Sequence, residues 1–178
     1  LTEQELSSLF EGFKYRFYSR EDLVDLLLAV QRTVKSFGSL NNCFCAGYKE
    51  SDKTVVPALN HLVETLNLRC KLKMIADPSK NSACKRLHLY LRWMIRTDDI
   101  DPGGWTGIPK SKLLIPLDTH IYKVSKMLRL TNRNDSGIKT AIEITENLKL
   151  FDREDPVRFD FSITRPGIHP ELGYEEFK

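Results

Sequence analysis

Long apolar runs are missing from this sequence, and none approaches the roughly 20 residues that a membrane-spanning helix needs. No signal peptide opens the chain either. We therefore expect a cytoplasmic protein that has no membrane partner. The chain begins at Leu1 without an initiating methionine, which indicates that a further N-terminal portion precedes it in the complete protein.

Metal-binding signatures are also missing. The four cysteines contain no Cys-x-x-Cys pair, and the four histidines lie far apart in the sequence. This pattern favours reduced, structural thiols over a zinc site or an iron–sulfur cluster. We expect no metal and no cofactor.

Strict alternation of apolar and polar residues, the signature of half-buried strands, does not occur over a useful length. Helical periodicity recurs instead, and helix-capping residues such as Thr2, Ser19, Ser82 and Ser136 precede the periodic stretches. The sequence predicts an all-α fold in a single helical domain over 1–178. Within it we distinguish a helical bundle part (1–76), a basic helix-loop-helix part (77–133) and C-terminal helices (134–178).

Charge is unevenly distributed along the chain. The net charge is +3 overall, but the basic part around residues 69–133 holds 14 Lys and Arg against 5 Asp and Glu. Its flanks are mildly acidic. This asymmetry favours a polyanionic partner, nucleic acid above all, although a solvated lysine-rich surface gives the same composition.

Asp118 lies in "LLIPLDTHIYKVSKML", between an apolar run and a basic amphipathic stretch. An aspartate directly before a helix accepts hydrogen bonds from the first helical N–H groups, and the helix dipole favours its ionised form. From these residues alone, Asp118 is an N-cap. The same helix start, with its nearby lysines, is also suited to holding a phosphate.

The segment around Asp118 resembles the Val-Asp-Thr-His segment of the helix-hairpin-helix DNA glycosylase superfamily. The matching residues are Pro116, Asp118, Thr119, His120, Ile121, Val124 and Leu128. The resemblance implies a glycosylase-like fold in which Asp118 points into the cleft for a flipped nucleotide. There it would stabilise the positive charge that develops on the sugar as the glycosidic bond breaks.

The whole chain, most clearly 77–161, resembles a bacterial family known only as a domain of unknown function, which implies the bacterial cytosol. The quoted segments are "DPSKNSACKRL", "WTGIPKSKLLIPLDTH" and "EDPVRFDF". The layout is also similar to that of archaeal 8-oxoguanine DNA glycosylases, which place a catalytic lysine early in a long helix. That resemblance implies Lys85 as a nucleophile that forms a Schiff base. An ordinary surface lysine, or one that pairs with phosphate, is the alternative.

Two features of the glycosylase superfamily are absent from the sequence. One is the Leu-Pro-Gly-Val-Gly hairpin that carries the catalytic lysine of bifunctional members, and the other is the cysteine array of members that bind an iron–sulfur cluster. We therefore expect no iron–sulfur cluster.

Several residues of the basic part are candidates for contact with DNA. Cations and polar groups would hold the phosphate backbone, and Trp105 would stack on a base or instead pin its loop to the core. Trp93 is expected in the core, and His88 on the surface or in packing. The candidate DNA-binding residues are Arg86, Arg92, Arg96, Lys110, Lys112, Thr119, His120, Lys123, Lys126 and Trp105.

The function that we expect is excision of a modified base from double-stranded DNA, with Asp118 and Lys85 as catalytic residues and a possible lyase step at Lys85. A nucleic-acid-binding module without catalysis is the alternative. A helical protein whose basic strip binds an acidic partner is the third reading. The sequence leaves open which lesion is recognised and whether the substrate is DNA or RNA.

Overall fold

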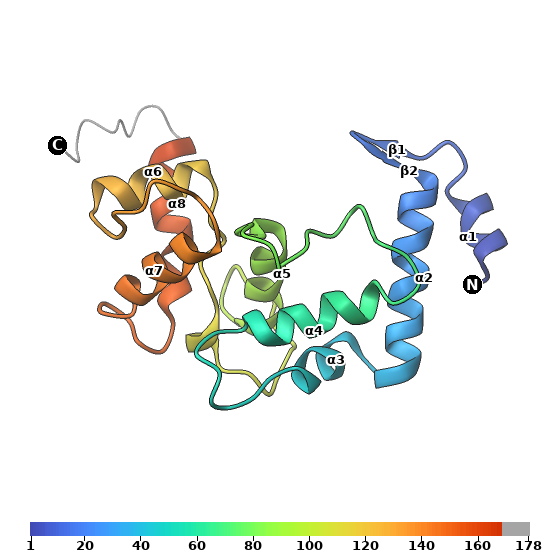
Figure 1. Cartoon of the computed structure of the whole chain (residues 1–178), viewed down its shortest axis with the longest axis horizontal. Coiled ribbons are helices and arrows are strands. Elements are labelled where there is room, and N and C mark those ends of the chain that lie inside the picture. The colour runs from blue at the N-terminus through green and yellow to red at the C-terminus, as the bar shows by residue number, and fades with distance from the viewer. Residues whose placement is uncertain (169–178) are drawn as a thin grey trace. The chain divides into compact units, whose positions relative to one another are not determined.

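The computed structural model describes residues 1–168 and is mostly helical (Figure 1). The C-terminal part predicted for 134–178 therefore extends, over residues 169–178, outside the described residues. Backbone contacts group the chain into two compact units. Unit 1 comprises residues 1–52 and 56–77, and unit 2 comprises residues 53–55 and the chain from 78 onward.

Unit 1 is built around the long helix α2 (Arg20–Phe37), with α1 (Glu3–Leu9), α3 (Leu40–Ala46) and α4 (Val56–Leu66) packed against it or each other (Figure 1). Two strands, β1 (Lys14–Tyr15) and β2 (Tyr18–Ser19), form a small antiparallel hairpin before α2. This sheet corrects the all-α prediction in detail, because the segment "FKYRF" (13–17) predicts only a short extended link.

The helix starts of unit 1 follow from local sequence. Capping boxes form at Thr2 with Glu5 and at Ser19 with Asp22, where each pair exchanges side-chain and backbone hydrogen bonds. Gly38 ends α2 with a φ of 81°, a conformation that glycine adopts without steric cost. The predicted capping box at Thr2, the predicted cap at Ser19 and the predicted helix end at Gly38 are confirmed, and the partner of Ser19, Asp22, is new from the structure.

Unit 2 contains α5 (Lys85–Ile95), α6 (Thr119–Met127), α7 (Ile138–Leu148) and α8 (Asp160–Ile168). Two short 3₁₀ turns, η1 (Lys110–Lys112) and η2 (Pro156–Phe159), lie in its connections. Its hydrophobic core joins residues of α6, α7 and α8 to the extended segment before α6. The core residues are Ala83, Ile115, Leu117, Ile121, Val124, Leu130, Ala141, Ile144, Leu148 and Ile163.

Two helix starts differ from the prediction. The helix expected to open at Ser82 begins at Lys85, because Cys84 occupies the left-handed region (φ 45°) and interrupts the helix before it. The helix expected to open at Ser136 begins after Gly137, whose backbone lies so close to Asn81 that a Cβ atom would clash there. In both cases long-range packing moves the start by about one turn or less.

Candidate catalytic site

Lys85 is the first residue of α5, and it lies where the helix dipole disfavours a positive charge. No side chain caps this helix, and the N–H groups of Leu87 and His88 bond to the carbonyl oxygen of Cys84. A cation in such a position is stabilised by a carboxylate placed close to it.

Asp118 supplies that carboxylate from the start of α6. The apolar segment before it, residues 113–117, is buried, and the N–H of Ile115 donates to the Thr145 hydroxyl of α7 (3.0 Å). Oδ1 of Asp118 accepts hydrogen bonds from the N–H groups of His120 (2.9 Å) and Ile121 (2.8 Å). The predicted N-cap role of Asp118 is confirmed, and the cap leaves its second oxygen available.

The second oxygen meets the lysine: Nζ of Lys85 lies 2.7 Å from Oδ2 of Asp118. The two residues are 33 positions apart in the sequence. The Lys85 side chain is 45% exposed and that of Asp118 is 17% exposed, so the pair lies at the surface but is not freely solvated. The structure therefore brings together the two residues predicted to be catalytic.

The pKa of the Asp118 carboxyl is set by opposing effects. Burial raises it, but the hydrogen bond from Lys85, the Ile121 N–H, the charge of Lys85 and the His120 N–H together bring it below its ordinary value. Asp118 is therefore ionised at neutral pH. It is suited to stabilising a positive charge and unsuited to donating a proton.

A small cavity of about 160 Å³ opens beside this pair. It is smaller than the roughly 300–1,000 Å³ of pockets for drug-sized ligands, so it has room only for a small ligand or for part of a larger one. Its walls combine the ion pair with apolar side chains from α5 and α8. The lining residues are Lys85, Leu89, Arg92, Pro116, Asp118, Ile121, Asp160, Phe161 and Thr164.

Asp160 is a second carboxylate in this cavity, and the sequence analysis did not single it out. Burial raises the pKa of its carboxyl, and the nearby charge of Asp118 acts in the same direction. The charge and hydrogen bond of Arg92, together with the Thr164 hydroxyl, oppose that rise only in part. The cavity thus holds two carboxylates whose pKa values are shifted in opposite directions.

Arg92 and Arg96 do not lie where a DNA backbone could reach them, which corrects their assignment as phosphate contacts. Both are buried, and both contact the fully buried carboxylate of Asp101. Arg92 also pairs with Asp160, and Nε of Arg96 donates to both oxygens of Asp155 (3.0 and 3.1 Å). These five side chains form a buried charge cluster that joins α5 to the loop after it and to the start of α8.

The remaining candidate DNA-binding residues differ in the exposure of their side chains and in their contacts within unit 2. Arg86, Thr119, His120 and Lys123 have exposed side chains near the starts of α5 and α6. Nothing in the geometry assigns a ligand to these four.

Three predicted contacts already have partners or are partly covered. Lys110 is half exposed and pairs with Asp155 (3.3 Å), and Lys112 is partly covered. Nζ of Lys126 donates to the carbonyl oxygens of Asn132 and Arg133, so it fixes the chain after α6. A structural role accounts for Lys126 without a ligand.

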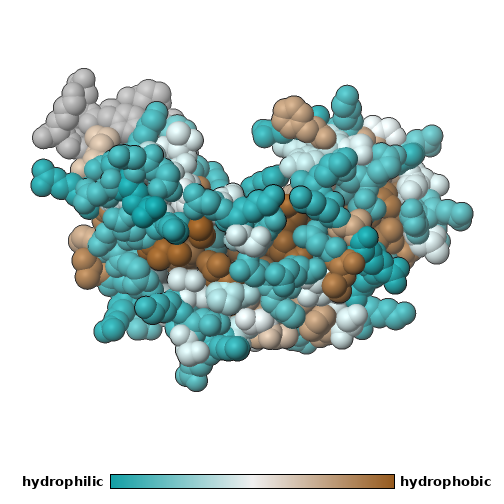
Figure 2. Space-filling view, in the orientation of Figure 1, coloured by the Kyte–Doolittle hydropathy of each residue, from teal (hydrophilic) through white to brown (hydrophobic). Residues whose placement is uncertain are grey.

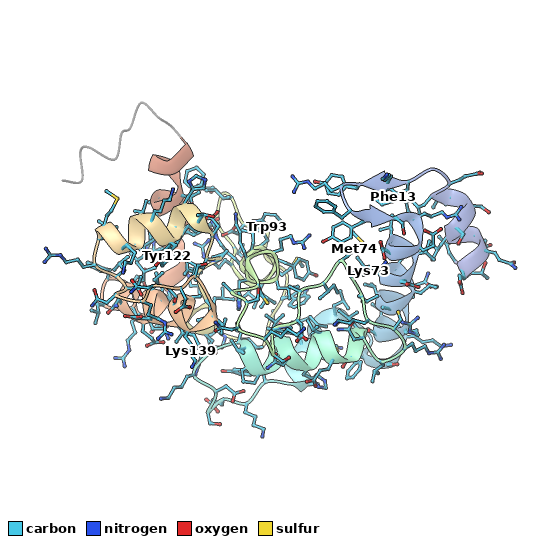
Figure 3. The ribbon with its side chains drawn as sticks, turned by 45° about the horizontal axis from the view of Figure 1, so that its top comes forward. Phe13, Lys73, Met74, Trp93, Tyr122 and Lys139 are labelled. Carbon is cyan, nitrogen blue, oxygen red and sulfur yellow. The ribbon has the colours of Figure 1, made fainter. Side chains whose placement is uncertain are left out.

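The aromatic residues near α5 also separate into two kinds. Trp105 is partly buried and packs edge-to-face on Tyr90, with ring centroids 5.5 Å apart, which fits its loop-pinning role. Trp93, expected in the core, is 44% exposed and projects from α5 (Figure 3). His88 occupies the core instead, with 1% exposure.

The part of the chain that the structure describes contains no group of three or more His, Cys, Asp or Glu that could hold a metal ion. None of the four cysteines forms a disulfide. Over residues 1–168, none of the helices combines the length and the apolar character needed to cross a bilayer.

Comparison with known proteins identifies one family. The DUF2400 family, described as "Protein of unknown function", matches residues 1–169 of this chain. No curated protein and no solved structure matches the chain significantly.

Proposed function

The chain belongs to the DUF2400 family, and from the chemistry of its Lys85–Asp118 pair we propose that it is a DNA base-excision glycosylase. It binds DNA, accepts a flipped modified base at the cavity of unit 2 and cleaves the N-glycosidic bond. Within this proposal, the helical fold is of the helix-hairpin-helix glycosylase type, and Lys85 adds a lyase step.

One observation carries the proposal: a lysine ammonium and a capped carboxylate meet at 2.7 Å on the wall of a cavity. The sequence resemblance implies catalytic roles for these same two positions, which lie 33 residues apart. An ordinary surface ion pair between them would contribute little to stability, about 0–1 kcal/mol. Stability therefore supplies only a weak reason for this arrangement.

Asp118 would stabilise the transition state. Breaking the bond between C1′ and the base nitrogen builds positive charge on the sugar, and an ionised carboxylate beside C1′ lowers the energy of that cation. Two backbone N–H groups hold the carboxylate in place, so it needs little reorganisation as the charge develops.

Lys85 would act as the nucleophile. Its ammonium group first releases a proton to solvent, and the nitrogen lone pair then forms a bond to C1′. The bond from C1′ to the base breaks, and the base departs with that electron pair and takes up a proton. The C1′–O4′ bond then breaks, and the ring oxygen takes that electron pair and the proton that the lysine nitrogen releases. A C=N bond, the Schiff base, remains between Lys85 and the sugar.

Cations at the surface of unit 2 would hold the phosphate backbone. Arg86 and Lys123 are exposed near the starts of α5 and α6, the two helices that begin at Lys85 and directly after Asp118. Each phosphate contact releases a counterion, so binding should weaken steeply as the salt concentration rises.

Borohydride trapping tests the proposal, because borohydride reduces the Schiff base to a stable amine. The protein is incubated with duplexes that carry 8-oxoguanine, uracil, an alkylated base or an abasic site, and both released base and covalent adduct are scored. Lys85→Gln should abolish the adduct, and Asp118→Asn should abolish base release while keeping the N-cap. Lys80→Gln, at an exposed lysine five positions earlier, is the matched control and should leave both unchanged.

Absence of both adduct and base release from every duplex would refute the glycosylase. Salt-sensitive DNA binding without turnover would then support the alternative, a nucleic-acid-binding module without catalysis. Binding to DNA that does not depend on salt would favour an acidic protein partner.

A further inference from the structure

The β1–β2 hairpin of unit 1 presents an aromatic side chain to solvent at its tip. Lys14 pairs with Ser19 and Tyr15 with Tyr18, so Arg16 and Phe17 form the two-residue turn. Phe17 is 95% exposed, the highest exposure of any large apolar residue among those described. Figure 2 shows a hydrophobic group at this end of unit 1 that projects among hydrophilic neighbours.

Cations and aromatic rings alternate along the hairpin. Residues 13–19 contain two cations (Lys14 and Arg16) and no acidic residue, while the next cation, Arg20 at the start of α2, is paired with Glu21 (3.0 Å). The guanidinium of Arg16 lies over the Tyr15 ring, 5.5 Å from its centroid, and the Tyr15 side chain is itself 55% exposed. The tip therefore combines planar stacking surfaces with positive charge.

The backbone of the turn is strained at Arg16, which has a φ of 54°. The left-handed region costs a residue with a Cβ atom roughly 1–2 kcal/mol, and glycine normally occupies the first position of such a turn. A strained non-glycine residue beside an exposed phenylalanine indicates that the side chain at position 16 has a use outside folding.

The base of the hairpin is held firmly. Ser19, its last residue, is also the N-cap of α2, and it exchanges hydrogen bonds with Asp22. Phe13, beside the hairpin end of α2 (Figure 3), packs edge-to-face on Phe10 with centroids 6.3 Å apart. The exposed Phe17 ring is thus carried on an anchored support, so little of its ordering has to occur on binding.

We propose that this hairpin tip is a second nucleic-acid contact, which binds unpaired bases. Phe17 stacks on an exposed base, and Arg16 and Lys14 contact the adjacent phosphates. An anionic membrane would also attract the cations. However, a membrane-surface site needs a broad apolar face, and this tip offers one phenylalanine flanked by charged groups. The inference does not depend on catalysis by Lys85 and Asp118, which belong to unit 2.

Fluorescence anisotropy with the full chain tests the proposal. The probes are a labelled single-stranded oligonucleotide and a fully paired duplex of the same sequence. Phe17→Ala should weaken binding to the single strand by about 5- to 150-fold, the range for loss of one stacked base, and should change duplex binding less. Leu68→Ala, at another exposed apolar residue of unit 1 (79% exposed), should have no effect.

Arg16→Gly separates the side chain from the turn. Glycine accepts the left-handed conformation, so the hairpin should remain folded, as far-ultraviolet circular dichroism and an unchanged melting temperature would show. Binding to the single strand should nevertheless weaken, and the slope of log K against log salt should fall by about one phosphate contact, near 0.7.

Equal binding of wild type and Phe17→Ala to the single strand would overturn the proposal. So would binding to vesicles of phosphatidylserine and phosphatidylcholine that requires Phe17 while neither oligonucleotide binds, since that result would assign the tip to a membrane surface. Catalysis is scored by base release and adduct formation in Lys85→Gln and Asp118→Asn, and this contact by single-strand binding in Phe17→Ala and Arg16→Gly. Failure of the glycosylase proposal and failure of this one are therefore measured by different variants.

Discussion

Acidification should destabilise unit 2 through His88, and His88→Leu should remove that sensitivity. The side chain is 1% exposed, and neither ring nitrogen has a hydrogen-bond partner among the described residues. Burial lowers its pKa from 6.5 to about 4, because the charged imidazolium is poorly stabilised in the core.

The direction of this pH dependence follows from proton binding at His88. Between the two pKa values the unfolded chain carries a proton at His88 and the folded protein does not, so stability falls as the pH falls below about 6.5. With these values, unfolding becomes easier by about 2 kcal/mol between pH 7 and pH 5, and by about 3 kcal/mol at pH 4. The whole stability of a domain is about 5–15 kcal/mol, so the effect is large enough to measure.

Urea unfolding at several pH values, followed by tryptophan fluorescence, measures how much His88 changes the unfolding free energy with pH. Trp93 and Trp105 are the two tryptophans of the chain, and both lie in unit 2, so the signal reports on the unit that contains His88. The difference between wild type and His88→Leu cancels the other titrating groups. His120→Gln, at an exposed histidine of α6, is the control and should keep the wild-type pH dependence.

An equal loss of stability in wild type and His88→Leu between pH 7 and pH 5 would refute the reasoning. It would mean that the folded core accommodates the imidazolium.

Three further predictions concern unit 2. Asp101→Asn should destabilise it by about 3–5 kcal/mol because two buried arginines lose their shared carboxylate, whereas Asp98→Asn, at a 39% exposed partner of the same cluster, should cost about 1 kcal/mol or less in urea unfolding. Gly103→Ala should lower the melting temperature more than Gly104→Ala, because both glycines have positive φ but only Gly103 would also bring its Cβ into a neighbouring side chain. Asp118→Asn should leave the unfolding free energy at pH 7 within about 1 kcal/mol of wild type, because asparagine also caps helices and the lost ion pair is partly exposed. The folded pKa of Asp118 is lowered, so the ionised carboxylate's contribution to the unfolding free energy should be lost only as the pH falls below about 3.8.

Local signals could be read from the sequence and are confirmed. The capping box at Thr2, the N-caps at Ser19 and Asp118 and the helix end at Gly38 each depend on residues within about one helical turn. Such interactions act over a few positions of the chain, so the sequence contains all that determines them.

Long-range partners decided the cases that sequence reasoning missed. An arginine on a helix face resembles a phosphate contact until its carboxylate is located, and Arg92 finds Asp160 68 positions later. The same pairing explains why Asp160 escaped notice: only the fold places it beside the Lys85–Asp118 pair. A useful signal existed in the spacing of His88, Arg92 and Arg96, which puts all three on one helix face together with the buried Leu91.

Sequence and fold also differ at the hairpin. The segment 13–17 predicts only an extended link, because two-residue strands leave too short an alternation to recognise, and the turn lacks the usual glycine. Two-residue turns are normally identified by that glycine.

The buried charge cluster has a consequence for how this family can diverge. Replacing Arg92, Arg96 or the Asp101 that contacts both of them leaves buried charged groups without their partner, while replacing partners together does not. Single substitutions at these three positions should therefore be costly, and changes there should occur as paired exchanges. Across relatives of this chain, the five positions of the cluster should covary as a set, although 68 residues separate the first from the last.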